Sequence, residues 1–438
     1  MRTLTSLAGL VLLAALPLYC QTASSGTSPD TAVLEQKIRD LEDRIVALEG
    51  QVRMLKSAPP VQAAAAGAPA GETAGAAAQA PTAALVSSPE QSPTLGGAGG
   101  SASKALNPDI SVIGDFIGAG GGNSAPPSAT LQPVPALQMH ESEVGLQAII
   151  DPYARGDFFI SFGEQGVDLE EGYITFTALP ASFVAKVGKM RSAFGKVNGL
   201  HNHVLPWIDR PLVTTNLVGG EDGIDDAGVS IQRILPAPKG IFLEATGQMF
   251  RGDSGGVFQS QQRSDVSTVD HLRAYKDISE STNLDIGVSY ARGHNNGTSV
   301  LNPVPFTDQI TSLYGVDATL RWKPLRRSIY HSFIARSEFI WSQRQQFPVE
   351  QRAFGFYASG DYQLGRRWFL GGRYDQSDRA AFANLNDKGG SIMLTYWPSE
   401  FSQIRGQYEF TKYAEGINSN QLLLQLIFSL GAHGAHPF

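Results

Sequence analysis

The chain has 438 residues and a formal net charge of −7; charged side chains make up 17% of it, and 47 residues are glycine. The acidic balance excludes the basic footprint of a nucleic-acid-binding protein. So few charges with so much glycine are untypical both of a soluble α/β enzyme and of a highly charged disordered chain.

Residues 1–23 have the organisation of a secretory signal peptide. Arg2 gives a positive start, the stretch LAGLVLLAALPLY is apolar, and the small polar residues QTASSG follow. The apolar stretch is shorter than a membrane-spanning helix, so we expect an exported chain without transmembrane helices. Cys20, the single cysteine, has two interpretations: a lipid-acylated residue, or one lost with the signal peptide. Tyr19 directly before it favours the second, because that acylation usually requires a small residue there.

Residues 31–56 carry a heptad pattern. Seven apolar residues alternate between spacings of four and three: Leu34, Ile38, Leu41, Ile45, Leu48, Val52 and Leu55. The pattern predicts a short parallel α-helical coiled coil, and hence an oligomer. Ile and Val at one seam position with Leu at the other favour two strands. The alternative, a single amphipathic helix lying on its own domain, lacks an adjacent domain to lie on.

Residues 57–106 are rich in alanine, proline, glycine and serine. Between Pro59 and Ser103 the charged residues are Glu72 and Glu90. A segment of this composition cannot bury a core, and it is predicted to be a flexible linker between the coiled coil and the rest of the chain.

From residue 107 to residue 438, apolar and polar residues alternate with a period of two. In NLDIGVSYAR (283–292), for example, the apolar side chains fall on one side, and Asp285, Gly287 and Ser289 fall on the other. Segments of this kind predict strands. Sixteen are predicted, centred near residues 112, 146, 158, 174, 186, 230, 244, 272, 287, 317, 337, 357, 370, 393, 407 and 426.

The predicted connections alternate in length. LPAS, PAPKG, SEST, KPLRR, QLGRR and WPSE are tight, whereas RGDSGGVFQSQQRSDVS, RGHNNGTSVLNPVPFTDQ and DQSDRAAFANLNDK are longer. An even strand number with short turns on one side and longer loops on the other is typical of bacterial outer-membrane barrels. We therefore expect an all-β fold at 107–438: a 16-stranded antiparallel transmembrane β-barrel, preceded by the short α-helical coiled coil. Sixteen strands leave an aqueous channel.

A soluble β-sandwich is the alternative reading of the same periodicity. The glycine content and the lack of cysteine beyond residue 20 favour the barrel, as do aromatic residues near the strand ends, which are typical of the girdles where lipid meets water. These aromatic residues are Tyr153, Trp322, Trp341, Trp368, Tyr396 and Trp397.

The longest predicted connection, residues 191–228, is rich in Leu, Val and Trp. Long ordered loops are usually functional, and apolar residues need a surface to pack on. We expect this loop to fold inward and narrow the pore; the alternative is that it caps the rim or contacts a neighbouring subunit. The candidate constriction residues are Lys196, His201, His203, Asp209, Arg210, Glu221, Asp222, Asp225 and Asp226.

Charges of both signs are predicted to face the channel. The stretch GGEDGIDD (219–226) is either a patch that favours cations or a solvated turn. The pore-wall candidates share the inward parity of their strands: Arg155, Asp157, Asp317, Arg321, Arg336, Glu338, Arg373, Arg405 and Glu409. Because both signs occur together, we expect no strong preference for one ion.

The histidines and nucleophiles indicate neither a metal site nor an enzyme. His201 and His203 stand at i and i+2 and could hold a metal ion, but Asp209 is the one conceivable third ligand nearby. The favoured interpretation is that they are polar loop histidines, and His433 and His436 are no stronger candidates. No nucleophile with its base is visible, so we expect no enzyme activity and no cofactor.

Four stretches resemble the phosphate-selective (O/P) superfamily of bacterial outer-membrane porins. They are LNPDISVIGDF (106–116), DPYARGDFFISFGEQGVDLEEGYITF (151–176), VGKMRSAFGKVN (187–198) and HVLPWIDRP (203–211). The resemblance implies a trimeric sixteen-stranded channel, inserted by the machinery that reads a C-terminal aromatic strand. LLLQLIFSL (422–430) would be that strand and Phe438 its aromatic residue, although GAHGAHPF separates the two. Phosphate selectivity is not implied, because carboxylates match the basic residues.

Three functions are compatible with these features. The first is a porin for passive diffusion of small hydrophilic solutes or ions across the outer membrane. The second is a barrel that tethers the membrane mechanically through its coiled coil. The third is a secreted β-rich binding protein on a stalk. Partners expected for the first are outer-membrane lipid, the barrel-insertion machinery and further copies of the chain, with no nucleic acid.

Overall fold

The computed structural model describes residues 108–121, 136–163, 166–297 and 308–431. The predicted signal peptide, coiled coil and linker lie outside these residues, and so do His433, His436 and Phe438. None of the described helices has the length and apolar character needed to cross a membrane.

Sixteen strands make up most of the described chain. The first eight are β1 (Asp109–Gly121), β2 (Leu137–Asp151), β3 (Ala154–Gly163), β4 (Gly166–Phe176), β5 (Phe183–Arg191), β6 (Asp225–Leu235), β7 (Ile241–Phe250) and β8 (Ser267–Ser279). The second eight are β9 (Thr282–Asn295), β10 (Gln309–Trp322), β11 (Phe333–Gln346), β12 (Val349–Gly365), β13 (Trp368–Arg379), β14 (Phe382–Ser399), β15 (Ser402–Lys412) and β16 (Asn418–Gly431). Each centre expected from the alternation falls inside one of these strands.

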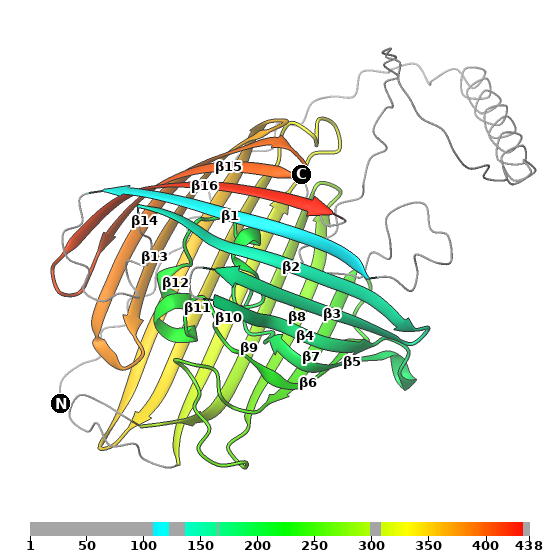
Figure 1. The fold of residues 1–438 in the computed structure, drawn as a ribbon, viewed down its shortest axis with the longest axis vertical. Helices are drawn as coiled ribbons and strands as arrows, with labels where there is room; N and C mark the ends of the chain where they lie inside the picture. The colour runs from blue at the N-terminus through cyan, green and yellow to red at the C-terminus, as the bar shows by residue number, and fades with distance from the viewer. Residues whose placement is uncertain (1–107, 122–135, 164–165, 298–307, 432–438) are drawn as a thin grey trace, which may run out of the picture. The chain divides into compact units, whose positions relative to one another are not determined.

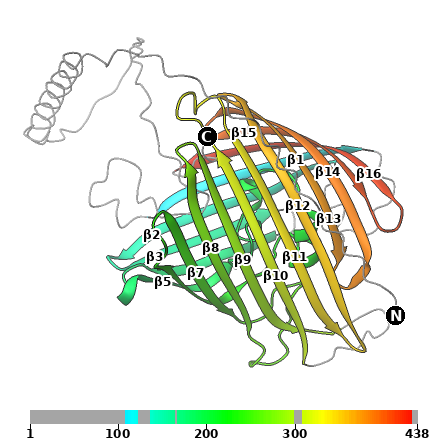
Figure 2. The same cartoon turned by 180° about the vertical axis from the view of Figure 1, so that it is seen from behind.

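The strands form one closed antiparallel barrel in which every strand pairs with its sequence neighbours and β1 pairs with β16 (Figures 1 and 2). The closing pair runs in register from Ser111 opposite Gly431 to Gly121 opposite Gln421. Closure removes the free sheet edges, so backbone donors and acceptors are paired within the protein, as a lipid environment requires. The expected 16-stranded barrel is confirmed.

The two faces of the barrel wall differ in polarity. On β16, Leu424 is 55% exposed and Gln425 is 2% exposed. Gln425 donates a hydrogen bond to Asp115 of β1 at 3.0 Å and thus lies on the polar face inside the ring. Large apolar side chains such as Ile286 and Val316 are exposed on the opposite face. The wall is therefore apolar outside and polar inside, the reverse of a soluble sandwich.

Two apolar residues of β16 break this pattern for a reason that the structure supplies. Leu423 and Ile427 share the parity of Gln425 and are each 1% exposed. Leu423 packs with Ile117 of β1 and Ile208, and Ile427 packs with Ile113 of β1. The inner wall near the closing pair therefore offers apolar surface to the chain inside the barrel.

Residues 375–388 were predicted as a long loop, and that prediction was wrong. β13 and β14 continue through this stretch and leave only residues 380–381 between them. Here both faces of the hairpin are polar: Asn386 donates to Asp378 at 2.8 Å on one face, and Arg379 pairs with Asp387 at 2.9 Å on the other. With polar residues on both sides, the alternation gave no strand signal.

Candidate functional site

The segment that connects β5 to β6, residues 192–224, is called the inner loop below. It packs against the inward face of the wall. Its buried apolar side chains are Phe194, Val197, Leu205, Trp207, Ile208, Val213, Leu217, Val218 and Ile224. Most of them form one cluster with side chains from many strands: Tyr173, Met190, Phe250, Val269, Ala291, Leu313, Ile340, Ala353, Tyr357 and Met393. Burial of this apolar surface stabilises the loop in the lumen.

Two short helical turns shape the inner loop, Asn202–Val204 and Thr214–Val218. The second ends at Gly219, whose φ of 102° lies in the left-handed region that favours glycine. The loop therefore has its own local structure, and its inward position agrees with the expectation drawn from its apolar content.

Trp207 is the largest fully buried side chain of the inner loop, at 1% exposure. Its ring meets the ring of Tyr357 edge-on, with centroids 5.1 Å apart. The guanidinium of Arg373 lies 5.0 Å from its centroid. An edge-to-face pair and a cation–π contact both favour this geometry, so Trp207 anchors the loop on β12 and β13.

The loop segment after Trp207 is hydrogen-bonded to β13 and β15. Arg373 donates to the backbone carbonyl of Asp209 at 2.9 Å and forms an ion pair with its carboxylate. Gln407 donates to the same carboxylate and accepts from the backbone N–H of Ile208 at 3.0 Å. Asp209, predicted as a constriction residue, thus fixes the loop to the wall.

The loop segment around Lys196 is bound to β9 and β11. Lys196 lies 3.2 Å from the carboxylate of Asp285. The backbone N–H of Gly195 donates to Ser289 at 2.9 Å, and that of Lys196 donates to Glu338 at 3.3 Å. Gly195 has a φ of 63°, and a Cβ there would collide with the Glu338 carboxylate. A glycine at this position permits the close approach.

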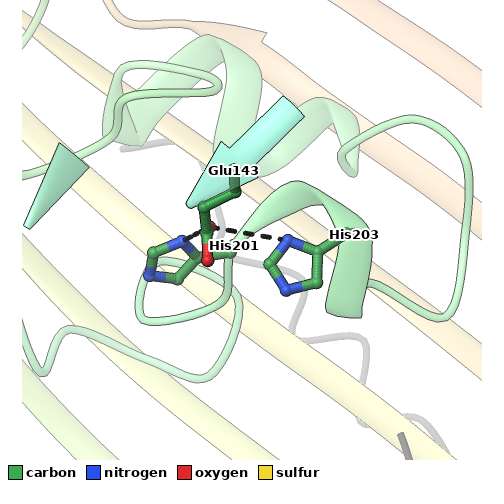
Figure 3. A group of neighbouring side chains, drawn as sticks. All are labelled: Glu143, His201 and His203. Carbon is green, nitrogen blue, oxygen red and sulfur yellow. Dashed lines mark hydrogen bonds and ion pairs between the residues drawn. The ribbon is translucent and has the colours of Figure 1, made fainter. Parts of the chain in front are cut away.

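His201 lies among three carboxylates from β2 and β4. Its Nδ1 is 2.7 Å from Glu143 and 2.9 Å from Glu170, and its Nε2 is 2.9 Å from Glu171. His203 approaches Glu143 from the other side, with Nδ1 at 3.6 Å from the same oxygen (Figure 3). Burial disfavours the charged ring, but the three carboxylates raise the pKa of His201 well above its usual value.

Asn202 and Arg210 complete this side of the loop. Asn202 donates to Glu141 at 2.9 Å and accepts from Arg210 at 3.0 Å. Arg210 also donates to the backbone carbonyls of Val197 at 3.1 Å and Leu200 at 2.6 Å. Burial lowers the pKa of Arg210, yet a guanidinium stays charged in proteins. Arg210 was predicted as a constriction residue. In the structure its hydrogen bonds connect two parts of the inner loop to each other.

Sequence alternation missed His140 and Glu170 because a β-bulge adds each of them to the regular inward-facing residues of its strand. The pairing of β2 with β1 skips His140, and the pairing of β4 with β3 skips Glu170. A bulge disrupts strict alternation and re-aims a side chain. His140 and Glu141 both contact the inner loop, and so do Glu170 and Glu171. The sequence signal for this group was the spacing of Glu141 and Glu143, which stand two residues apart and therefore face the same side of a strand.

The acidic stretch 219–226 divides between two environments. Glu221 is exposed but lies 3.2 Å from His140, and Asp222 is exposed. Loss of hydration would raise the pKa of Glu221, but the hydrogen bond with His140 together with the nearby charges of His140, Arg210 and Arg191 lowers it. Glu221 is therefore the residue of this stretch that is bound to His140 of β2.

Asp225 and Asp226 lie at the first residues of β6. Asp225 pairs with Lys189 at 3.2 Å. Asp226 accepts backbone hydrogen bonds from Gly252 at 2.9 Å and Asp253 at 2.7 Å. The Asp226 carboxylate is therefore occupied by backbone N–H groups. The acidic stretch does not form one patch of free carboxylates.

The nine pore-wall candidates lie on the inward face of their strands, and most are paired there. Arg155 forms an ion pair with Asp157, and Arg336 forms one with Asp361. Arg405 donates to the backbone carbonyl of Leu205 in the inner loop at 2.9 Å. The remaining candidates on this face are Asp317, Arg321, Glu338, Arg373 and Glu409. Charges of opposite sign lie side by side, which limits the net field inside the barrel.

Comparison with known proteins gives the fold and one distant relative. No protein-family model matches the chain. An uncharacterized protein of Aquifex aeolicus is 27% identical over 387 residues, covering 76% of this chain and 81% of that protein. OmpT of Vibrio cholerae, an outer membrane protein in a trimer form, is 8% identical with a TM-score of 0.51, over 74% of this chain and 99% of its own. OmpF of Salmonella typhi, in complex with daunomycin, is 9% identical with a TM-score of 0.51, over 75% and 99%. At these identities the two structures share the barrel fold with this chain.

Proposed function

We propose that the chain forms a water-filled porin in the bacterial outer membrane, for passive diffusion of small hydrophilic solutes or ions. The observation that carries the proposal is the closed wall with exposed apolar side chains outside and charged side chains inside. Such a wall suits lipid on one face and water on the other. A barrel of sixteen strands is wide enough for an aqueous channel.

In this proposal the inner loop is the constriction. It is bound to β2, β4, β9, β11, β13 and β15 through side chains that include Glu143, Glu171, Asp285, Glu338 and Arg373. A segment held on so many strands crosses the lumen and reduces the area open to solutes. Lys196, Asp209 and Glu221 keep partly exposed side chains, so they are the loop charges that a solute would meet.

We further propose the arrangement outside the barrel. Residues 1–23 would direct export, residues 31–56 would form a periplasmic coiled coil, and residues 57–106 would link that coiled coil to the barrel. The assembly would be a homotrimer inserted by the barrel-insertion machinery, related to the phosphate-selective porin superfamily but without its phosphate specificity. The trimer form of the Vibrio OmpT barrel supports this oligomeric state, which chemical cross-linking of the native membrane protein would test.

Single-channel recording in planar bilayers tests the function. The purified full chain is expected to give discrete conductance steps, and a barrel that folds but never conducts would contradict the proposal and favour a tether. Replacing residues 198–222 by a short Gly-Ser linker is expected to raise the conductance roughly twofold or more, since it clears the lumen. The same linker in place of residues 324–330, in the β10–β11 connection, is the control and should leave conductance unchanged.

A further inference from the structure

We propose that Glu143, His201 and His203 bind a divalent transition-metal ion of the zinc class inside the barrel. One ligand atom from each residue lies within 4.8 Å of the others. Glu143 is 2% exposed, His201 7% and His203 8%, so the group is enclosed by protein. Figure 3 shows the Glu143 carboxylate between the two imidazole rings. Glu143 comes from β2, and both histidines come from the inner loop.

The spacing of the ligand atoms fits a small ion. Zinc binds histidine nitrogen and carboxylate oxygen at about 2.0–2.2 Å, which separates neighbouring ligand atoms of a tetrahedral site by about 3.3 Å. The oxygen of Glu143 is 2.7 Å from Nδ1 of His201 and 3.6 Å from Nδ1 of His203. Small side-chain rotations therefore admit the ion, which displaces the proton that Nδ1 of His201 shares with Glu143.

The donor types favour zinc over calcium or magnesium. Two imidazoles and a carboxylate suit zinc and related transition metals, whereas the hard cations take oxygen ligands. A metal-bound histidine usually donates its second ring N–H to a carboxylate. Glu171 is already in that position, 2.9 Å from Nε2 of His201.

The charges around the group provide a second, independent argument. Glu141, Glu143 and Glu170 are buried and their oxygens lie within 4.8 Å of one another. Among arginines and lysines in the described part of the chain, only Arg191 forms an ion pair with them, at 3.3 Å from Glu170. Oε1 of Glu141 is buried and accepts no hydrogen bond from any described donor. Three buried carboxylates thus face two cationic partners, Arg191 and His201. A divalent cation in place of the His201 proton would offset the remaining negative charge, which is costly when buried.

The consequence for the molecule is a cross-link. The ion would join β2 to the inner loop at a point where the hydrogen-bonded ion pair of His201 with Glu143 now holds them, and it would make the constriction more rigid.

Equilibrium dialysis of the purified full chain against Zn²⁺, with metal content measured by mass spectrometry, tests the proposal. His433 and His436 are first replaced by alanine and no histidine tag is used, so that the C-terminal histidines add no sites. We expect one Zn²⁺ per chain, with at least about tenfold weaker binding in Glu143→Gln and His203→Gln. His331→Gln, in the β10–β11 connection, is the matched control and should bind like the parent. Absence of stoichiometric Zn²⁺, or unchanged binding in both site variants, would overturn the proposal.

A second measurement does not depend on the variants folding. Co²⁺ added to the parent protein is expected to give the intense visible absorption of a four-coordinate site, and Zn²⁺ should remove it. The weak spectrum of six-coordinate aqueous Co²⁺ would overturn the proposal. Neither measurement requires ion conduction, so the metal site and the proposed channel can fail separately.

Discussion

Arg373 of β13 holds Asp209 of the inner loop by two groups at once, donating to its backbone carbonyl at 2.9 Å and pairing with its carboxylate. The Arg373 side chain is 1% exposed. Arg373 also forms an ion pair with Asp375 on its own strand at 2.6 Å, and its guanidinium lies over the ring of Trp207. One side chain therefore connects the polar and the apolar attachment of the loop to the wall.

Substitution Arg373→Gln is expected to loosen the inner loop without opening the barrel. Removing one partner of a buried ion pair costs about 3–5 kcal/mol. Here the cost falls on the docking of the inner loop, because the hydrogen bonds between strands are unchanged. Single-channel traces should become noisier, and limited proteolysis should cut within residues 192–224. Arg352→Gln, which removes an exposed arginine of β12, is the control. Quiet traces and an intact loop in Arg373→Gln would show that this contact does not hold the constriction.

Substitution Gly195→Ala is expected to detach the loop from β11. The left-handed φ costs an alanine roughly 1–2 kcal/mol, and its Cβ would displace the Glu338 carboxylate that Lys196 uses. The change in loop stability can be followed by proteolysis in increasing denaturant. Gly199→Ala is a matched control in the same loop, because a Cβ there meets nothing within 4 Å. Equal protection of the two variants would contradict the role given to Gly195.

Arg336 and Asp361 offer a test of how wall charges act on ions. They form an ion pair across β11 and β12 and keep 24% and 16% of their side chains exposed. Arg336→Gln should move the reversal potential in a salt gradient toward cations, and Asp361→Asn should move it toward anions by a comparable amount. The double variant should return close to the parent value. An unchanged reversal potential in both single variants would mean that permeating ions do not sense this pair.

Cysteines placed at two neighbouring positions of β16 test which face of the strand points toward lipid. With Cys20 replaced by serine, a cysteine at position 424 should react poorly with water-soluble reagents and be quenched by lipid-borne probes. A cysteine at position 425 should do the opposite, because Leu424 faces out and Gln425 faces in. Reversed accessibility would refute the membrane-facing wall and with it the proposed porin.

The sequence was informative wherever one side of a strand is uniformly apolar. In Leu422–Leu430 the alternation placed the strand and its outer face, although Leu423 and Ile427 look like exceptions until their inner partners are seen. It failed at residues 375–388, where both faces are polar. It also failed at His140 and Glu170, because a bulge adds one side chain at each of these positions and because their partner, the inner loop, joins them only through tertiary contact.

The hydrogen bond between Ile208 and Gln407 spans 199 positions along the chain. Strand β15 is synthesised after β1–β14, so the earlier segment has no place to dock on that side until the ring is almost complete. Narrowing of the lumen is then a late event in assembly, and a nascent barrel missing its final strands would leave this segment without its hydrogen bonds to Arg405 and Gln407.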